Sequence, residues 1–388
     1  MKCMSMLTRP DDEQGDVNQV MKRTDSEDTK SLIFFNQQGC SSPTFTIEAL
    51  ESEKSSYYYF LKHHTCYDLL PESAKLVILD TDLSIKKAFY ALIYNNVRAA
   101  ILWDSSKQNY IGMLTITDFI KVLVTLYPPD GGKMDEFEEG SISSWRKINK
   151  SFAILPLVHV TPECSLLNAS KMLLQYRFHR LPIIDMIQGN ALHILTHKRI
   201  LKYLHLNRHH LPTAKFMYKS LRELKLGTYL PNVHSITKTT TIIEALRIFL
   251  KKKVSCLPIV DENGQLIELY AKFDVINLAV TLTYNNLDIP VYDALEFRRS
   301  NRDRYPPPLT CLKSDELQNV MVKIIESGVH RLVVVDNMNK LEGIISLSDI
   351  LKYLTGWSDG TGSPVRSDII KMHKFVINNS NPLRNSHS

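Results

Sequence analysis

The chain has 388 residues, 44% of them hydrophobic, and a formal net charge of +6. This length accommodates about two domains with buried cores. The modest charge, without a block of Lys and Arg interleaved with aromatics, argues against a nucleic-acid-binding protein. The sequence opens with charged and polar residues and has no run of about 18 apolar residues, so we expect neither a secretory signal nor a membrane span. Six scattered cysteines without a C-x-x-C pair are typical of a reduced, intracellular protein.

Both ends of the chain and two internal stretches are predicted to lie outside the folded domains. Residues 1–57 are rich in Asp, Glu, Ser, Gln and Lys and predict a disordered N-terminal tail. Residues 128–144 form an acidic, breaker-rich connection, and the YPPP stretch at 305–308 forms a stiffer one. The polar residues 357–388 are assigned to a C-terminal tail.

Four amphipathic helices are predicted in chain order, each with one apolar stripe at helical spacing. The stripes begin at Ile85, Leu166, Ile242 and Leu317. Thr161 followed by Pro162, and Ser314 before two acidic residues, are predicted as helix start signals.

Each helix is followed by the same pattern of two strands. The first strand ends in an aspartate, at Asp104, Asp185, Asp261 and Asp336. The second strand runs into a tetrapeptide that opens another helix, and these tetrapeptides (TITD, THKR, AKFD, SLSD) end at Asp118, Arg199, Asp274 and Asp349. From strand-end Asp to tetrapeptide end the gaps are 14, 14, 13 and 13 residues, and successive tetrapeptide ends lie 81, 75 and 75 residues apart. This regularity predicts an internal repeat.

The repeat predicts an α/β fold of four tandem copies paired into two modules. One copy of about 60 residues cannot cover its own sheet, whereas two copies can bury their sheets against each other. We expect the first module over residues 58–207 and the second over 208–356.

The tetrapeptides suit a nucleotide because a helix N-terminus attracts phosphate. A following carboxylate, as in Asp118, Asp274 and Asp349, can accept hydrogen bonds from a ribose diol. The alternative is that these carboxylates only cap the helix. The second copy has Arg199, which has no acceptor, and we therefore expect its cleft to be empty.

Basic residues recur at the start of the first strand. Equivalent positions hold Arg98, His179, Ser255 and His330, and the next positions hold Ala99, Arg180, Cys256 and Arg331. Lys198 precedes Arg199, and Arg298 lies between the third and fourth copies. If the copies assemble about a centre, these charges converge into a phosphate site. If they do not, each is a separate solvated charge.

Catalytic and metal-binding alternatives find little support. His193 and His197 have the spacing of a zinc-binding helix, but the repeat places His193 on a strand. No phosphate-binding loop, dinucleotide fingerprint or kinase catalytic motif is present, so phosphoryl transfer lacks its usual groups. We expect no catalytic residue and no metal site.

The repeat resembles the CBS motif, whose pairs are known as Bateman modules. The strings CYDLLPESAKLV, VRAAILWD, GMLTITDFI, HRLPIID, ILTHKRILKYL, AKFDVINLA, TYNNLD, VHRLVVVD and GIISLSDIL resemble the γ-subunit family of AMP-activated protein kinase over about residues 63–355. This resemblance implies a flattened disk of two Bateman modules that binds AMP, ADP and ATP toward a central channel. It also implies a kinase catalytic α subunit and a scaffolding β subunit as partners, in the cytoplasm and also the nucleus, with no nucleic acid and no membrane span.

The resemblance further implies nucleotide contacts at matching positions. In the first module these are Arg98, Met113, Leu114, Thr115, Ile116, Thr117, Asp118, Val158, His179, Arg180 and Lys198. In the second they are Thr228, Val233, Ser255, Cys256, Ala271, Lys272, Phe273, Asp274, Arg298, Leu309, His330, Arg331, Ser346, Leu347, Ser348 and Asp349. Three positions depart from the family pattern: Ala271 replaces Ser, while Cys256 and Val233 each replace Ala. The first change loses a hydroxyl, and the others add bulk near a base.

The sequence thus predicts an energy-sensing, non-catalytic regulatory subunit in which bound nucleotide biases the docking of a kinase subunit. A rival is an interaction scaffold whose clefts are empty or hold one permanent nucleotide. An enzyme would need a catalytic domain, for which the repeats leave little patterned sequence.

Overall fold

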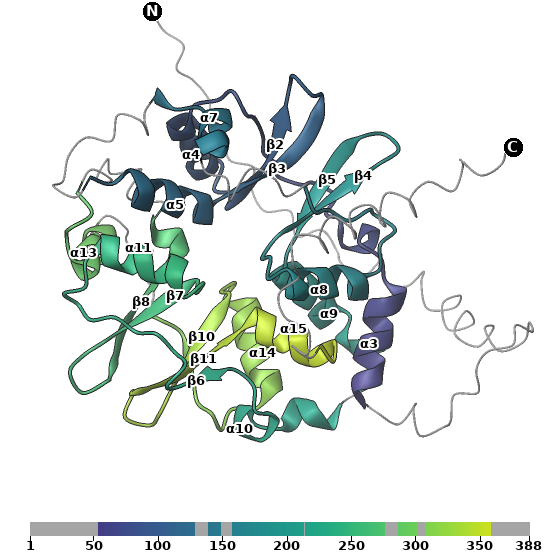
Figure 1. Ribbon diagram of the computed structural model, residues 1–388. Coiled ribbons are helices and arrows are strands. Elements are labelled where there is room, and N and C mark those ends of the chain that lie inside the picture. The colour runs from purple at the N-terminus through teal and green to yellow at the C-terminus, as the bar shows by residue number, and fades with distance from the viewer. Residues whose placement is uncertain are drawn as a thin grey trace, which may run out of the picture. The chain divides into compact units, whose positions relative to one another are not determined.

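The computed structural model describes residues 53–128, 139–148, 157–212, 214–275, 286–300 and 307–357. All of them belong to one compact unit, Glu51–Ser388 (Figure 1). Most of the two predicted tails lies outside these residues. The helix α3 (Glu53–His63) nevertheless begins before the predicted tail boundary at 57. The predicted connection over 128–144 also needs correction, because α7 (Ile142–Ile148) occupies its end.

Four copies of a helix–strand–strand–helix unit follow one another as predicted. The first contains α4 (Ile85–Tyr94), β2 (Ala99–Asp104), β3 (Asn109–Thr115) and α5 (Ile116–Leu126). The second contains α8 (Leu166–Gln175), β4 (Leu181–Asp185), β5 (Asn190–Leu195) and α9 (His197–Leu206). The third contains α11 (Ile242–Lys251), β7 (Cys256–Val260), β8 (Leu266–Ala271) and the 3-10 helix η5 (Lys272–Val275). The fourth contains α14 (Leu317–Glu326), β10 (Arg331–Val335), β11 (Leu341–Ser346) and α15 (Leu347–Leu354).

Shorter elements connect the copies. They are η2 (Tyr67–Leu69), β1 (Ile78–Asp80), η3 (Arg208–His210), η4 (Lys215–Tyr218), α10 (Leu221–Leu224), β6 (Thr228–Tyr229), α13 (Val291–Ser300) and β9 (Thr310–Cys311). Among the described residues, no helix is both long and apolar enough to cross a bilayer.

Local hydrogen bonds explain where the first helix begins in three of the four copies. The side chains of Ser84, Ser165 and Thr241 accept from the backbone N–H three residues on, which satisfies a donor that the helix leaves free. The predicted start at Thr161 and Pro162 is therefore wrong, because α8 begins at Leu166 after its Ser165 cap. The predicted start at Ser314 is also wrong: α14 begins after Glu316, whose side chain makes no capping bond.

The aspartate that ends the first strand shapes the hairpin turn. Oδ1 of Asp185 accepts from the N–H groups of Ile187 and Gln188, at 2.9 and 3.3 Å. Asp261 and Asp336 bond turn N–H groups in the same way. An Asp side chain that bonds the backbone two or more residues on favours a tight turn. The repeated strand-end aspartates are thus structural.

The strands form small sheets built on one plan. In each copy the two strands pair antiparallel: β2 with β3, β4 with β5, β7 with β8, and β10 with β11. The first strand of the pair also meets a short parallel segment, which is β1 in the first copy and β9 in the fourth. In the second and third copies it is a single bridge, from Val160 to Ile183 and from Ile236 to Ile259.

Buried clusters join the copies in two ways. One small cluster, including Ile101 and Ile184, lies between the sheets of the first and second copies. Another, including Leu266 and Val333, lies between those of the third and fourth. Two large clusters run through the helices instead: α5 contacts α11, and α9 contacts α15 (Figure 1). Each copy therefore contacts one neighbour through its sheet and another through its helices.

Candidate functional site

Each tetrapeptide lies where the second strand meets the second helix. In the first copy, the N–H and Oγ1 of Thr115 both donate to Oδ2 of Asp118, at 2.8 and 2.7 Å. In the fourth copy, Ser346 donates to Oδ2 of Asp349 in the same way, at 2.8 and 2.6 Å. In the third, Ala271 has no hydroxyl, so only its N–H donates to Asp274, at 2.7 Å. The expected loss of a hydroxyl at Ala271 therefore removes one bond of this capping box.

These bonds show that the two interpretations of the aspartates are compatible. The capping box uses Oδ2 of Asp118 and of Asp349, and the other oxygen of each carboxylate takes no part in it. Oδ1 of Asp118 lies 3.7 Å from Nζ of Lys121. Burial raises the pKa of Asp118, while Lys121 and the Thr115 bonds oppose that rise. Each side chain can thus cap its helix with one oxygen and offer the other to a ligand.

The junction of the second copy is built differently. The Thr196 side chain caps α9 by accepting from the N–H of Arg199, at 3.3 Å. Nε of Arg199 donates to the carbonyl oxygen of Leu69, at 2.9 Å. Leu69 belongs to η2, which precedes the first copy. The structure therefore places at this position a cation that is already bonded to the protein backbone.

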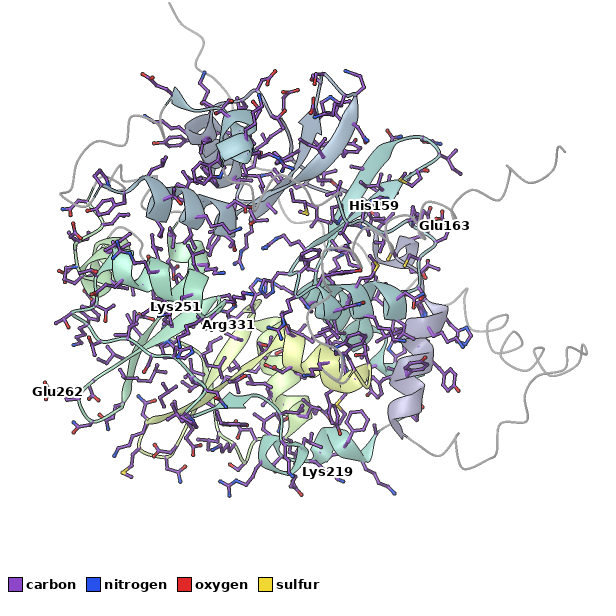
Figure 2. The ribbon with its side chains drawn as sticks, in the orientation of Figure 1. His159, Glu163, Lys219, Lys251, Glu262 and Arg331 are labelled. Atoms are coloured by element: carbon purple, nitrogen blue, oxygen red, sulfur yellow. The ribbon has the colours of Figure 1, made fainter. Side chains whose placement is uncertain are left out.

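Basic side chains from different copies converge, as the repeat predicted they could. Burial, together with Arg98, lowers the pKa of Arg180 to about 10. Burial and Arg331 likewise lower the pKa of Arg98, which Asp274 raises. Burial, Arg331 and Lys121 lower the pKa of Lys272 to about 8. Groups that lower one another's pKa by repulsion lie close together. Figure 2 shows Arg331 near the middle of the four repeats.

Contacts between copies hold this cluster in place. The guanidinium of Arg98 lies over the ring of Phe273, with Cζ 4.4 Å from the centroid. Other contacts tie Arg331 Nη2 to Ser255 Oγ at 2.9 Å, Lys272 Nζ to Thr117 Oγ1 at 3.4 Å, and Lys198 Nζ to the Gly328 carbonyl at 2.8 Å. In the part of the chain that the structure describes, Nη1 of Arg331 is buried without a hydrogen-bond partner. Buried cations of this kind favour a bound anion.

The two histidines of the cluster are neutral rather than cationic. Burial, with His197, Arg331 and Arg180, lowers the pKa of His179 to about 3. Burial, with Arg98 and Arg331, lowers that of His330 to about 3. A neutral imidazole still carries one N–H that can donate to an anion.

The other predicted site residues differ in how deeply their side chains are buried. Buried apolar side chains belong to the cores: Leu114, Ile116, Val233 and Leu347. Partly buried apolar side chains border these cores: Met113, Val158, Phe273 and Leu309. Thr228 is exposed on β6, opposite Ile344, and the buried Cys256 opposes Ala271. Ser348 is partly buried in the first turn of α15. Arg298 lies in α13, with its side chain outside the described part.

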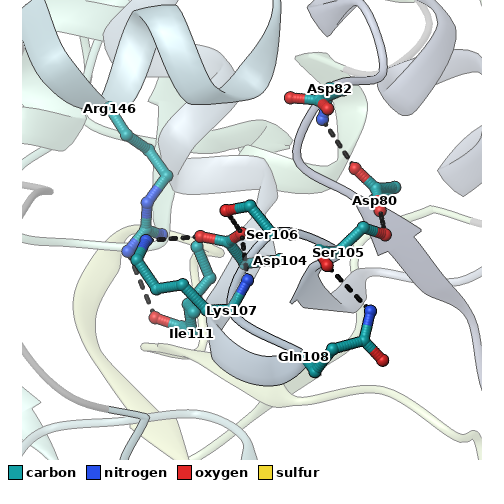
Figure 3. Close-up of polar contacts among 9 residues, drawn as sticks. All are labelled: Asp80, Asp82, Asp104, Ser105, Ser106, Lys107, Gln108, Ile111 and Arg146. Carbon is teal, nitrogen blue, oxygen red and sulfur yellow. Dashed lines mark hydrogen bonds and ion pairs between the residues drawn. The ribbon is translucent and has the colours of Figure 1, made fainter.

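The sequence missed Arg146, which lies beside Ile111 of β3 in the first copy (Figure 3). Its Nη2 donates to the carbonyl oxygen of Ile111, at 3.2 Å. A Cβ atom on Gly112 would stand 2.8 Å from its Nη1, so the absence of a side chain at Gly112 lets the guanidinium approach β3. Arg146 also contributes to keeping Asp118 ionised. It lies in α7, outside the repeated pattern, and no sequence signal marked it.

His197 was considered only as a metal ligand. It opens α9, whereas His193 lies on β5, so the two do not share a helical face. Within the described ranges, no cluster of three or more His, Cys, Asp or Glu residues could hold a metal ion. The ring of His197 instead lies 5.9 Å from that of His179, centroid to centroid. Burial and Arg180 lower the pKa of His197 to about 4.

The fold and the four equivalent junctions define a CBS-repeat protein. The family model of the CBS domain matches residues 68–125, 150–206, 227–280 and 304–356, more than half of the chain. The chain therefore belongs to the CBS-domain family, and the predicted four-repeat fold is confirmed. A crystal structure of a Methanocaldococcus jannaschii protein, described as an archaeal homologue of γ-AMPK, has a TM-score of 0.56 at 16% identity over 75% of this chain and 99% of its own. That likeness concerns the fold alone.

Curated relatives show which proteins with CBS domains this chain resembles. The chain is 44% identical over 336 residues to 5'-AMP-activated protein kinase subunit gamma-3 of Sus scrofa, which covers 85% of this chain and 65% of the relative. It is 46% identical over 298 residues to the subunit of the same name from Homo sapiens, covering 77% of this chain and 60% of the relative. Homology to γ subunits is thus confirmed, although the chain spans less than two thirds of these relatives.

Proposed function

We propose that this chain is a non-catalytic regulatory subunit of an AMP-activated protein kinase that senses AMP, ADP and ATP. One observation carries the proposal: buried basic side chains from all four copies converge beside carboxylates at helix N-termini. Phosphate satisfies such cations, and a ribose diol satisfies the carboxylates. The homology to γ-3 subunits supports the same assignment.

The proposed roles of individual residues are supported by the geometry and by the family resemblance. Arg98, Arg180, Lys198, Lys272 and Arg331 contact phosphate, with neutral His179 and His330 as further donors. Arg298 is added to this group by the family resemblance. Asp118, Asp274 and Asp349 accept ribose hydroxyls. The remaining contacts implied by the family resemblance, including Met113, Val158, Thr228, Val233 and Leu309, border the base.

The proposed assembly has two modules and two partner subunits. The modules are residues 58–207 and 208–356, and the clusters shared between the sheets of neighbouring copies support this pairing. The partners are a catalytic α subunit and a scaffolding β subunit, in the cytoplasm and the nucleus. AMP or ADP displaces ATP, and the bound species changes how the kinase subunit docks. This is a coupling free energy between sites.

Calorimetry on the complex co-expressed with α and β subunits tests the proposal. Titration with AMP should show saturable binding that ATP competes away, and AMP should change kinase activity or protect it from dephosphorylation. The chain purified alone should transfer no phosphoryl group. Nucleotide that survives dialysis and does not exchange would instead support the rival, an interaction scaffold. Failure to co-purify with either subunit would remove the kinase assignment.

A further inference from the structure

Two cysteines face each other just before the first repeat. Thr65 and Ser165 form an antiparallel bridge, flanked by the bonds from Cys66 N to Cys164 O and from Leu166 N to His64 O, both 2.8 Å. This register places Cys66 opposite Cys164. Opposed residues in an antiparallel ladder present their side chains on one face, with Cα atoms about 5.5 Å apart. That separation lies within the range that a disulfide spans.

The thiols of Cys66 and Cys164 differ in burial and in the direction in which their pKa is shifted. Both are free, and their side chains are hydrogen-bonded to each other. Cys66 is fully buried, and the bond to Cys164 together with burial raises the pKa of Cys66. Cys164 is partly exposed, and the bond from Cys66 lowers the pKa of Cys164. The more accessible sulfur is therefore the one that more readily becomes a thiolate, which is the reactive form.

We propose that Cys66 and Cys164 form a thiol-oxidation site that a hydroperoxide converts into a disulfide. The Cys164 thiolate attacks the hydroperoxide, the O–O bond breaks, and an alcohol, or water from hydrogen peroxide, leaves with one proton. Cys164 is then a sulfenic acid. The Cys66 sulfur attacks Sγ of Cys164, its proton goes to the departing hydroxide, and water leaves. Two thiols are oxidised by two electrons, and one peroxide is reduced.

The disulfide would fasten a segment that already rests on the second copy. The N–H of Tyr67 donates to the carbonyl oxygen of Pro162 at 2.8 Å, and the carbonyl oxygen of Leu69 accepts from Arg199 at 2.9 Å. The adjoining helix α3 contacts α8. A covalent bond at Cys66 would therefore hold residues 64–70 against the second junction and limit local opening of that segment.

The other described cysteines lack these features. Cys256 is buried and lies opposite Ala271. Cys311 is buried and lies opposite Val334, and burial, together with Asp315, raises the pKa of Cys311 to about 12. Cys311 therefore provides a control, since it is buried like Cys66 but has no cysteine opposite it.

The test treats the full-length chain with hydrogen peroxide, blocks remaining thiols with iodoacetamide, and maps cross-linked peptides by mass spectrometry. We expect a Cys66–Cys164 linkage as the dominant product, reversed by dithiothreitol. The Cys66→Ser variant should accumulate Cys164 sulfenic acid that dimedone traps, and Cys311→Ser should leave the linkage intact. Sulfenic acid that persists on Cys164 of the unmodified chain, or preferential linkage to Cys3 or Cys40, would overturn the proposal.

A second measurement does not depend on a variant, because replacing the buried Cys66 could weaken the fold. Hydrogen exchange of the backbone amides of residues 66–70 is compared in the oxidised and the reduced chain. Slower exchange in the oxidised chain, restored by dithiothreitol, is expected. Unchanged exchange in a chain shown to carry the linkage would mean that the bond does not fasten this segment, and would overturn the proposed consequence.

Discussion

At the scale of single residues, the central cluster combines buried positive charge with few counter-ions. Arg98 is desolvated and repelled by Arg331, while Asp274 favours its charge. Such a group contributes little to the stability of the empty protein and much to binding an anion. The cluster is therefore suited to recognising phosphate rather than to holding the fold together.

The first prediction follows for Arg98→Gln. Loss of a charge-assisted bond should weaken AMP binding by about 1.5–3 kcal/mol. The melting temperature of the nucleotide-free protein should stay nearly unchanged, because a repelled charge is removed. Calorimetry and thermal unfolding measure the two quantities. A much lower melting temperature with unchanged affinity would show that Arg98 is structural.

The neutral histidines predict how stability depends on pH. An unfolded histidine has a pKa of 6.5, whereas that of folded His330 is about 3. Between these values the unfolded state binds more protons, so the free energy of unfolding should fall as the pH drops from about 6.5 toward 3. His330→Gln should make this fall less steep, and the exposed His209→Gln should not. The free energy of unfolding is measured with denaturant as a function of pH for the unmodified chain and both variants. The same pH dependence in all three would contradict a neutral, buried His330.

The same residues show what the sequence could predict. The residues at matching positions correctly predicted the strand-to-helix junctions, because a repeat reveals equivalent positions without a structure. The protonation of His179 and His330 could not be predicted, since it depends on burial among cations from other copies. Arg146 could not be predicted for a similar reason, because it contacts β3 from a helix that is not part of the repeat.

At the scale of elements, the second junction explains why the copies are not equivalent. Arg199 donates to Leu69 instead of offering an acceptor. A ribose placed there would lose the partner of its hydroxyls, at a cost of about 1–3 kcal/mol. We therefore predict that crystals soaked in excess AMP show ribose at Asp118, Asp274 or Asp349 and none at Arg199. Ordered ribose beside Arg199 would contradict this.

The edge strand β6 yields a prediction about packing. A Cβ atom on Gly343 would lie 2.5 Å from Cδ1 of Tyr229 and 2.7 Å from the carbonyl oxygen of Thr228. Gly343→Ala should therefore displace β6 and destabilise the fold by about 1–3 kcal/mol. Gly112→Ala is the control, because its nearest neighbour is the far end of the flexible Arg146 side chain. Similar melting temperatures for both variants would show that β6 can move without destabilising the fold.

Element boundaries were predicted less well than element identity. The apolar stripes correctly gave the four first helices, because burial fixes which face of a helix points inward. The starts of α8 and α14 were misplaced, since several polar residues precede each stripe and the capping geometry alone selects one of them. The helix α7 was missed because it begins at the end of an acidic stretch that contains several breakers.

At the scale of the whole unit, two kinds of contact alternate between the copies. Sheets join the first copy to the second and the third to the fourth, while helices join the first to the third and the second to the fourth. The predicted pairing within modules accounts for the sheets alone. The helical contacts follow from the apolar faces left on α5 and α9, which a sequence shows without naming the partner.

The final prediction concerns the module of residues 58–207 expressed alone. Without the second module, the buried side chains of α5 and α9 that pack on α11 and α15 would be exposed. Large apolar patches drive association. The fragment should therefore form dimers or larger species in sedimentation velocity, whereas the full chain should not. A monodisperse, folded monomer would show that the helical faces tolerate water.

The side chain of Lys272 links two of the four junctions. Its ammonium belongs to the third junction but bonds the hydroxyl of Thr117 in the first, at 3.4 Å. An anion that draws Lys272 toward itself also breaks that bond and frees the Thr117 hydroxyl to rotate. An anion bound at the third junction should therefore change the hydrogen bonding of Thr117 at the first. We therefore expect anion binding at these two junctions to be coupled, even where no backbone atom moves.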